Sequence, residues 1–440
     1  MYNKQRKYTK KKERLLNIKL RKTEKRPIKT NDGYEPIYTI IEPVNPAHRI
    51  LNFDGLRSIL SRYNFQECNQ FKCMSRKPAF VWLNYDEHSM HSLKRKYYNT
   101  PIYLQNSLAN LDSIDDKDRL HMDMKTRFPT IYNKYMAHSQ ILIPSWNPYG
   151  KSQIKRNMRI YIARPVNVLK EKREIGLQGK GYGGKDIVII HDKSSLQTAK
   201  NLLEKYEDVL ISDYIMNPLL FQERKFHIRV WFLASIINGE FSAYMLDFGR
   251  ILTAKLPYQH GDWSNQDIHD THLKSSDKDW FFPDDFTNTN ITTLDMDKPE
   301  MVNSKLINDI FQQIRVILKS VAELLAETVG LYDNIKNGFN FFGVDLMIKT
   351  DSRDDSGSGS TVVLIECNAE GTYKTKEPTT HKKLENILFS WIDKVILAQL
   401  FKHTRIESDK RDNRDNQIII SDGKNKYHSY KLFSKRLSKK

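Results

Sequence analysis

Apolar positions recur with two different periods along the chain, and they predict a protein built from both helices and strands. The clearest helix covers 304–329, where apolar residues follow helical spacing and Gly330 sits where a C-cap belongs. Weaker helical patterns begin near Leu51 and Lys117, and another covers 383–401. Apolar runs of strand length occur at 79–83, 141–143, 159–163, 187–190, 209–211, 226–234, 342–348 and 361–367. This mixture indicates an α/β (α+β) fold.

Both ends of the chain and one internal segment lack these periods. Residues 1–45 are basic and then interrupted by prolines, so we interpret them as an arm and a linker. Residues 259–300 are polar and acidic, which predicts a long surface loop. Residues 403–440 follow the last predicted helix, and we interpret them as a basic tail. The remaining body is too long for one compact core, so two or three packed subdomains are expected.

Charge is concentrated at the two ends of the chain. The net charge is +18, of which residues 1–30 contribute +11 and residues 423–440 contribute +7, so residues 31–422 are neutral. Cationic ends raise the rate of encounter with polyanions such as nucleic acid, an acidic protein tail or an anionic membrane. A solvated tail that only aids solubility explains the same residues equally well.

The cysteines and the apolar runs limit the class of protein. Three cysteines, Cys68, Cys73 and Cys367, are an odd and sparse set, which favours a reducing compartment over a disulfide framework. No second pair completes a zinc site with the first two. We expect no membrane span, because no apolar run reaches about 18 residues. The N-terminal residues also lack the apolar stretch of a secretory signal, so a cytoplasmic location is expected.

Two apolar strands near the C-terminus carry the sharpest chemical signal, because each contains a carboxylate. Glu366 and Asn368 are two residues apart and project from the same face of one strand. Asp345 on the neighbouring strand can join them. Three oxygen ligands suit Mg²⁺, with water and phosphate oxygens completing its shell. The alternative is a pair of carboxylates satisfied by basic neighbours, and spacing alone leaves both interpretations open.

A glycine-rich segment upstream offers backbone donors and cations. Residues 179–185 hold four glycines together with Lys180 and Lys185. Glycines let a chain approach phosphate oxygens and lysines neutralise them, although glycine-rich hairpin tips are also common. Further cations stand at strand positions, where pairing with a carboxylate is the alternative to nucleotide contact: Arg164, Lys225, Arg229 and Arg250.

In their order along residues 50–400, these segments resemble the tubulin-tyrosine-ligase-like family of ATP-grasp enzymes. The most specific similarity is residues 213–220 followed by Lys225-Phe226-His227-Ile228-Arg229. The family's pattern there is a Tyr-Ile/Leu-x-x-Pro-Leu-Leu turn and then Lys-Phe-Asp-Ile/Leu-Arg. Arg250 is similar to the family's next arginine, and the two carboxylate strands are similar to its metal-binding signature.

The resemblance implies an ATP-grasp fold and assigns roles to individual residues. It implies N-terminal (46–145), central (146–235) and C-terminal (236–402) subdomains, with ATP between the last two. ATP and Mg²⁺ would be the cofactors of a ligase that joins an amino acid to a protein through an acyl-phosphate. By resemblance, Tyr214 and Ile215 would bracket the adenine. The α- and β-phosphates would be held by Arg164 with Lys180 or Lys185, and the γ-phosphate would face Lys225, Arg229 and Arg250. Mg²⁺ would be bound by Asp345, Glu366 and Asn368.

The implied partners are an amino acid and a protein acceptor. Tubulin or another protein with an acidic tail is the candidate acceptor, and cationic arms would favour it. This would make association with the cytoskeleton an option. A ligase that acts on a small amino acid or peptide is a further option, and the sequence does not identify the amino acid.

The chain departs from the family's pattern at several positions that carry charge or hydrogen-bonding groups. The departures are Arg164 for lysine before proline, Asp213 for lysine before the adenine-turn tyrosine, His227 for aspartate, and Thr271-His272 for Thr-Asn. They motivate an alternative function, a catalytically weakened ATP-grasp module whose basic arms bind nucleic acid or another polyanion. The histidines of the acidic loop, His260, His269 and His272, are interpreted as solvated residues because no defined scaffold would hold zinc between them.

Overall fold

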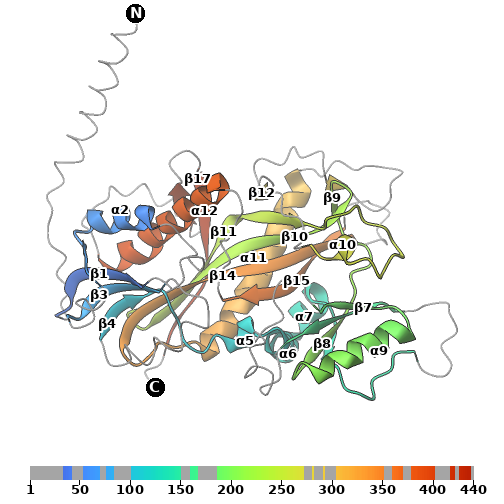
Figure 1. Cartoon of the computed structure of the whole chain (residues 1–440). Helices are drawn as coiled ribbons and strands as arrows, with labels where there is room; N and C mark the ends of the chain where they lie inside the picture. Colours follow the sequence, from blue (N-terminus) through green and yellow to red (C-terminus); the bar gives the residue numbers. More distant parts are fainter. Residues whose placement is uncertain are drawn as a thin grey trace, which may run out of the picture.

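The computed structural model is a mixed α/β protein with one large and one small sheet (Figure 1). It describes residues 33–41, 53–69, 76–83, 101–149, 159–166, 186–271, 280–281, 291–292, 304–350, 359–369, 378–401, 417–421 and 426–437. Thirteen described strands form the large sheet, with the main order β16-β17-β11-β10-β14-β4-β3-β1-β2. No helix among the described residues is long and apolar enough to cross a membrane.

Four long antiparallel strands form the centre of the large sheet. They are β11 (Glu240–Thr253), β10 (Arg224–Ile237), β14 (Ile335–Thr350) and β15 (Ser360–Asn368). The N-terminal strands β1 (Glu35–Ile41), β3 (Pro78–Leu83) and β4 (Ile102–Gln105) continue the same sheet, because β4 pairs in parallel with β14. The remaining strands of this sheet are β2 (Gln66–Glu67), β9 (Leu220–Phe221), β12 (Trp280–Phe281), β13 (Ile291–Thr292), β16 (Gln417–Ser421) and β17 (Lys426–Arg436).

The two faces of β10 show how one strand serves both the core and a polar site. Ile228, Val230 and Phe232 alternate onto the face that packs against helix α11 (Ser304–Thr328). On the opposite face, Trp231 packs with residues of helix α2 (Asp54–Arg62), helix α12 (Pro378–Trp391) and the π-helical turn η3 (Ile392–Leu397). That second face is polar at the start of the strand, so one edge of the large sheet carries cations and histidine instead of core.

The small sheet is antiparallel and stands beside the end of β15 that carries Glu366 and Asn368 (Figure 1). Its order is β5 (Ser139–Ile141), β8 (Val209–Asp213), β6 (Tyr161–Pro165) and β7 (Val188–Ile190). Helix α9 (Lys193–Asn201) packs on it and begins with a capping box, in which the Asp192 carboxylate accepts from the Ser195 N–H at 2.7 Å. The other short helices are α5 (Asp112–Asp115), α6 (Lys117–Arg127), α7 (Pro129–Tyr135), η2 (Leu202–Glu204), α10 (Gln266–His269) and α13 (Ala398–Leu400).

The apolar periods predict most of these elements correctly, and two local expectations are wrong. The helix expected at 304–329 and the strands expected at 342–348 and 361–367 are α11, β14 and β15. Gly330, however, is not a left-handed C-cap. Its N–H donates to the Ala109 carbonyl at 3.0 Å and its own carbonyl accepts from the Ala109 N–H at 2.9 Å, so a tertiary bridge ends the helix. The expected subdomain boundary at 235/236 falls inside β10, which is one continuous strand.

The interpretation of residues 403–440 as a basic tail is wrong for the strand β17. This strand pairs with β11, from Glu240 opposite Arg436 to Leu246 opposite Ser429. Its aromatic and aliphatic residues, Tyr430, Leu432 and Phe433, pack against the core. The physical reason is that these apolar side chains stabilise a strand, although the high lysine content suggested a solvated segment. The interpretation of residues 1–45 as an arm and linker is also wrong for Glu35–Ile41, which form β1 and pair with β3, while residues 1–32 and 42–45 lie outside the described residues.

Candidate functional site

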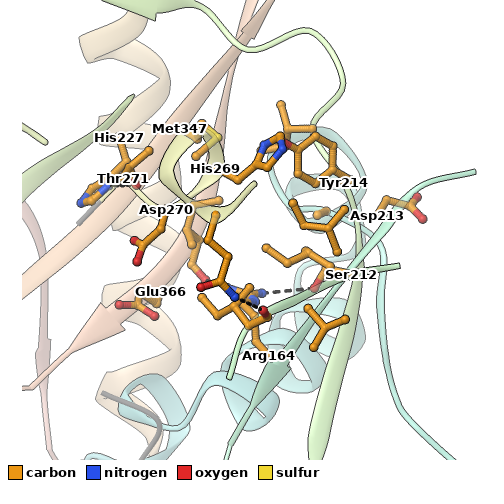
Figure 2. Close-up of a pocket in the computed structure, with 18 of the residues that line it drawn as sticks. Arg164, Ser212, Asp213, Tyr214, His227, His269, Asp270, Thr271, Met347 and Glu366 are labelled. Atoms are coloured by element: carbon orange, nitrogen blue, oxygen red, sulfur yellow. Dashed lines mark hydrogen bonds between the residues drawn. The ribbon is translucent and has the colours of Figure 1, made fainter. Parts of the chain in front are cut away.

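A cavity of about 720 Å³ lies between the small sheet and the polar end of the large sheet (Figure 2). Its walls come from β6, β7 and β8 on one side and from β10, β14 and β15 on the other. Helix α6, the beginning of α9 and the segment 261–271 complete the lining. A volume of this size is typical of small-molecule sites, which also form preferentially where two structural units meet.

Strand register places a row of four charged residues across the large sheet. Arg250 on β11, Arg229 on β10, Asp345 on β14 and Glu366 on β15 are successive cross-strand partners. Arg229 donates through Nε and Nη2 to the two carboxylate oxygens of Asp345, at 2.7 and 2.6 Å. Asp345 is only 2% exposed, so this bidentate contact compensates a carboxylate that is removed from water.

Glu366 contacts partners of different kinds. Lys117 of α6 brings its Nζ to 3.1 Å from Glu366 Oε2, and the Asn368 amide nitrogen donates to Oε1 at 3.1 Å. The amide oxygen of Asn368 therefore points away from Glu366 and is turned to accept or to coordinate. Asp345, Glu366 and Asn368 thus stand on adjacent strands, as the sequence predicts. The contacts to Arg229 and Lys117 also match the alternative interpretation, in which basic neighbours satisfy the carboxylates.

Arg164 joins the two sheets across the floor of the cavity (Figure 2). Its guanidinium is buried and donates from Nη1 to the Ile365 carbonyl on β15 and from Nη2 to Ser212 Oγ on β8, both at 3.1 Å. Nη2 also lies 3.4 Å from Nε2 of His121. Burial and the nearby Arg164 charge lower the pKa of His121 to about 3, so its imidazole is neutral near pH 7 and can accept this contact.

A hydrogen-bonded chain runs along another wall of the cavity. Lys225 Nζ lies 2.8 Å from the Tyr214 hydroxyl, which lies 2.7 Å from His269 Nδ1. His269 Nε2 is 2.7 Å from the Asp262 carbonyl. Because a carbonyl only accepts, Nε2 carries the proton, Nδ1 accepts from Tyr214, and the tyrosine oxygen accepts from Lys225. Burial lowers the pKa of His269 to about 4, which is consistent with this neutral tautomer.

The segment 261–271 closes the cavity by contacts to both sheets. Trp263 stacks on His269 with ring centroids 5.8 Å apart and meets Tyr214 edge-on at 5.4 Å. Gln266 Nε2 donates to the Ile187 carbonyl of the small-sheet side at 3.2 Å. The expectation of a solvated loop histidine is therefore wrong for His269, because an aromatic pair and two hydrogen bonds hold it.

Position 227, where this chain departs from the expected aspartate, contacts the same segment. His227 is buried, and its Nδ1 lies 2.6 Å from Thr271 Oγ1. Its Nε2 lies 3.7 Å from Asp345 Oδ1. The histidine thus ties the closing segment to the acidic end of the cavity. His272, the next residue of the departing pair, lies outside the described residues.

Several other expected site residues have different placements. Tyr214 and Ile215 line the cavity, whereas Arg250 is buried in the sheet beside Arg229 and does not line the cavity formed by the described residues. Asp213 also lines the cavity, and Figure 2 shows its carboxylate on the side away from Arg164, because it alternates with Ser212 on β8. Lys180 and Lys185 lie outside the described residues.

Comparison with known proteins supplies the family of the chain. The model of the tubulin-tyrosine ligase family matches residues 174–404, just over half of the 440 residues. The chain belongs to the tubulin-tyrosine ligase family. A curated relative from Schizosaccharomyces pombe, described as a probable tubulin–tyrosine ligase, is 29% identical over 259 residues. The aligned region covers 57% of this chain and 54% of the relative, so the chain spans about half of that protein's length.

The fold agrees with this family, and the family match contains most of the cavity. A large mixed sheet beside a smaller sheet is consistent with the ATP-grasp fold of tubulin-tyrosine ligases. Arg164 and the helix α6 precede the matched residues, although both contribute to the cavity walls. The contacts of Arg164 to Ser212 and Ile365 are among those that attach this earlier part to the matched region, together with the pairing of β6 with β8.

The structure adds cavity residues that the sequence did not identify. Lys117 and His121 are four residues apart on α6, so a shared helix face was a usable signal for them. Trp263 and His269 had no such signal, because their partner Tyr214 is distant in the sequence. Within the described residues, no three His, Cys, Asp or Glu side chains form a metal cluster, since the acidic end combines two carboxylates with an amide.

The lowered pKa of Lys225 predicts a measurable pH dependence of the free energy of unfolding. Burial lowers the pKa of its ammonium from 10.5 to about 7, so between pH 7 and 10.5 the unfolded chain binds more protons than the folded chain. Stability from this group therefore rises with pH in that window. Lys225→Met should be more stabilising at pH 7 than at pH 8.5, by about 2 kcal/mol, in paired urea titrations against the wild type. If the difference in free energy of unfolding between Lys225→Met and the wild type were the same at pH 7 and pH 8.5, this prediction would be contradicted.

Proposed function

We propose that the chain is an ATP-dependent carboxylate–amine ligase that adds an amino acid to a protein substrate. The observation that carries the proposal is the acidic pair Asp345 and Glu366 at one end of a cavity lined by Arg164, Lys225 and Arg229. Membership of the tubulin-tyrosine ligase family supports the same reaction class. Clustered cations beside two carboxylates suit a triphosphate with its metal ion, which has charge of both signs.

The residues present fit ATP and magnesium chemically. Asp345, Glu366 and Asn368 offer oxygen atoms, the ligand type that Mg²⁺ prefers. Arg164 and Lys225 would neutralise phosphate oxygens, and a lysine of the segment 179–185 would add to them. At the other end, Tyr214 and Ile215 would bracket the adenine, and apolar neighbours such as Ile162 and Met347 also line the cavity there.

The proposed reaction has two steps, and the chain's contribution is mainly electrostatic. A substrate carboxylate oxygen attacks the γ-phosphorus of ATP, ADP leaves, and an acyl-phosphate forms. The amine nitrogen then attacks the acyl carbon, the bond to the phosphate oxygen breaks, and the amine proton is lost. Bound magnesium would neutralise charge on the phosphate oxygens. Arg229, with Arg250 beside it in the sheet, would stabilise the charge that develops on the transferred group.

An acidic protein tail is the proposed acceptor or substrate class. The described basic strand β17 leaves Lys435 and Arg436 exposed, and residues 1–30 carry most of the remaining excess positive charge. These charges would attract a polyanionic tail over the distance that salt permits. Tubulin is the first candidate, in agreement with the name of the yeast relative. A cytoplasmic location is part of this proposal.

The experiment supplies purified chain with Mg-ATP, tubulin and labelled tyrosine, glutamate or glycine in separate reactions. We expect label in tubulin with one amino acid, together with release of ADP and phosphate in equal amounts. Reactions without ATP, and reactions with tubulin whose acidic tails are removed, are the controls. Neither incorporation of label nor consumption of ATP in any reaction would exclude the proposal for this acceptor.

A second candidate function is a catalytically weakened module that binds polyanions, and His227 is the observation that favours it. The imidazole bonded to Thr271 stands where the family pattern has aspartate. In this case residues 1–30 would carry salt-sensitive binding to RNA, and their deletion would abolish it. Residues 426–436 are kept in that variant because β17 is part of the sheet. Absence of nucleic-acid binding by the intact chain would eliminate this candidate.

A further inference from the structure

Both carboxylates at the acidic end of the cavity are in contact with a cation of the chain itself. Asp345 receives both hydrogen bonds of the Arg229 fork, and Glu366 receives Lys117 at 3.1 Å. These cations come from different elements, because Arg229 lies beside Asp345 on β10 whereas Lys117 reaches across from α6. A metal ion that uses these oxygens has to share them with two positive charges or replace those charges.

The position of Lys117 is unfavourable within its own helix. It is the first residue of α6, where the helix dipole disfavours a positive charge. Its side chain is only 22% exposed, and its partner Glu366 is 15% exposed. A local preference therefore does not explain a lysine at this place, whereas the contact with Glu366 does.

Replacing these cations has different consequences for a metal ion alone and for a metal ion that arrives with a triphosphate. A metal ion alone would leave Arg229 and Lys117 in a partly desolvated cavity without their counter-charge, which is unfavourable. A triphosphate presents new anionic oxygens to the same two side chains. The metal ion frees the two cations to contact phosphate, and the triphosphate gives them a new counter-charge when the metal ion takes the carboxylates. Each ligand therefore favours the binding of the other, which is positive coupling between two binding events.

We propose that Lys117 and Arg229 are internal counter-ions of Glu366 and Asp345, and that they make magnesium and the triphosphate of ATP bind as one coupled unit. This inference rests on the proposed function, because it assumes the same nucleotide site. Lys117 is a positioning residue in this scheme. Its ammonium holds the Glu366 carboxylate in place and would contact a phosphate oxygen instead when a metal ion binds Glu366.

The test measures binding without turnover and uses Lys117→Met. Mn²⁺ replaces Mg²⁺ as the probe, because the signal of free Mn²⁺ in electron paramagnetic resonance reports weak binding. Three titrations are made on each protein: Mn²⁺ alone, ATP with EDTA, and the preformed Mn-ATP complex, whose binding is followed by calorimetry because ATP also binds Mn²⁺ in free solution. Arg119→Met is the matched control, since Arg119 is on the same helix, is exposed, and pairs with Asp112 and Asp116 instead of the cavity.

For the wild type we expect each ligand to strengthen the binding of the other. Lys117→Met should bind Mn²⁺ alone about tenfold more tightly and metal-free ATP about tenfold more weakly, and the coupling should decrease by about tenfold, because the variant has no Lys117–Glu366 contact to break. Arg119→Met should match the wild type in all three titrations. Unchanged or weaker binding of Mn²⁺ alone by Lys117→Met would overturn the inference. If the wild-type protein nevertheless binds Mn²⁺ together with ATP, the proposed function still stands. A wild type that binds neither ligand would instead refute the proposed function.

Discussion

Asp345→Asn is expected to reduce ligase activity by about 10³-fold or more and to lower the free energy of unfolding by about 3 kcal/mol. The activity falls because the amide removes a negative charge that would hold the metal ion and its phosphate oxygens. The stability falls because Arg229, whose side chain is 11% exposed, loses its bidentate carboxylate partner. Rates of amino-acid incorporation and urea titrations of the same preparations measure the two effects.

A buried carboxylate outside the cavity provides the control for Asp345→Asn. Asp247 on β11 is also buried and accepts a hydrogen bond from the His428 N–H at 2.9 Å, but it does not line the cavity. Asp247→Asn should lower stability while incorporation stays within about twofold of the wild type, because the lost interaction is structural. If Asp345→Asn kept activity within tenfold of the wild type, Asp345 would not be a metal ligand.

Arg164→Met should weaken the binding of Mg-ATP by about 100-fold. This side chain is the direct link between β6, β8 and β15, and its removal leaves the Ile365 carbonyl and Ser212 without a charged donor at the cavity floor. Arg164→Lys should lose about tenfold, because an ammonium keeps the charge but cannot span both partners. Isothermal titration with Mg-ATP measures both variants.

Arg159 supplies the matched control for this second prediction. It precedes β6, is exposed and does not line the cavity, so Arg159→Met should bind Mg-ATP as the wild type does. The same affinity for wild type and Arg164→Met would contradict the assignment of Arg164 to the phosphate end. A loss shared equally by Arg159→Met would show that the effect comes from net charge.

The central fold could be predicted from the sequence because its elements have strong periods. The helix α11 and the strands β14 and β15 follow from apolar spacing, and antiparallel pairing of the two strands brings Asp345 opposite Glu366. The strand β17 was missed because its lysines dominate the composition, although its apolar side chains pack on the core. Composition was the weaker signal there, since one face of a strand can be apolar while the other is charged.

Strand spacing alone predicts the candidate site only where its residues share one strand or adjacent strands. The resemblance was needed to place Arg164, Tyr214, Ile215 and Lys225, which also line the cavity. The pair Glu366 and Asn368 required nothing beyond the strand period. Lys117 was missed because its contact with Glu366 joins a helix to a strand far along the chain. Arg250 lies opposite Arg229 in the sheet and is not among the described residues that line the cavity, so its expected role at a phosphate stays a prediction. Contacts between residues that are far apart in the sequence depend on tertiary packing, which no local sequence pattern contains.

The most direct test of the central claim, that Asp345, Glu366 and Asn368 hold the magnesium of ATP, is thermal unfolding with and without Mg-ATP. A ligand that binds only the folded chain stabilises it by about 2.7 kcal/mol at 100 times its Kd, so the wild-type midpoint should rise by several degrees. ATP with EDTA should raise it much less. Glu366→Gln should lose the magnesium-dependent part of the increase. An increase in Glu366→Gln equal to that of the wild type would contradict the claim.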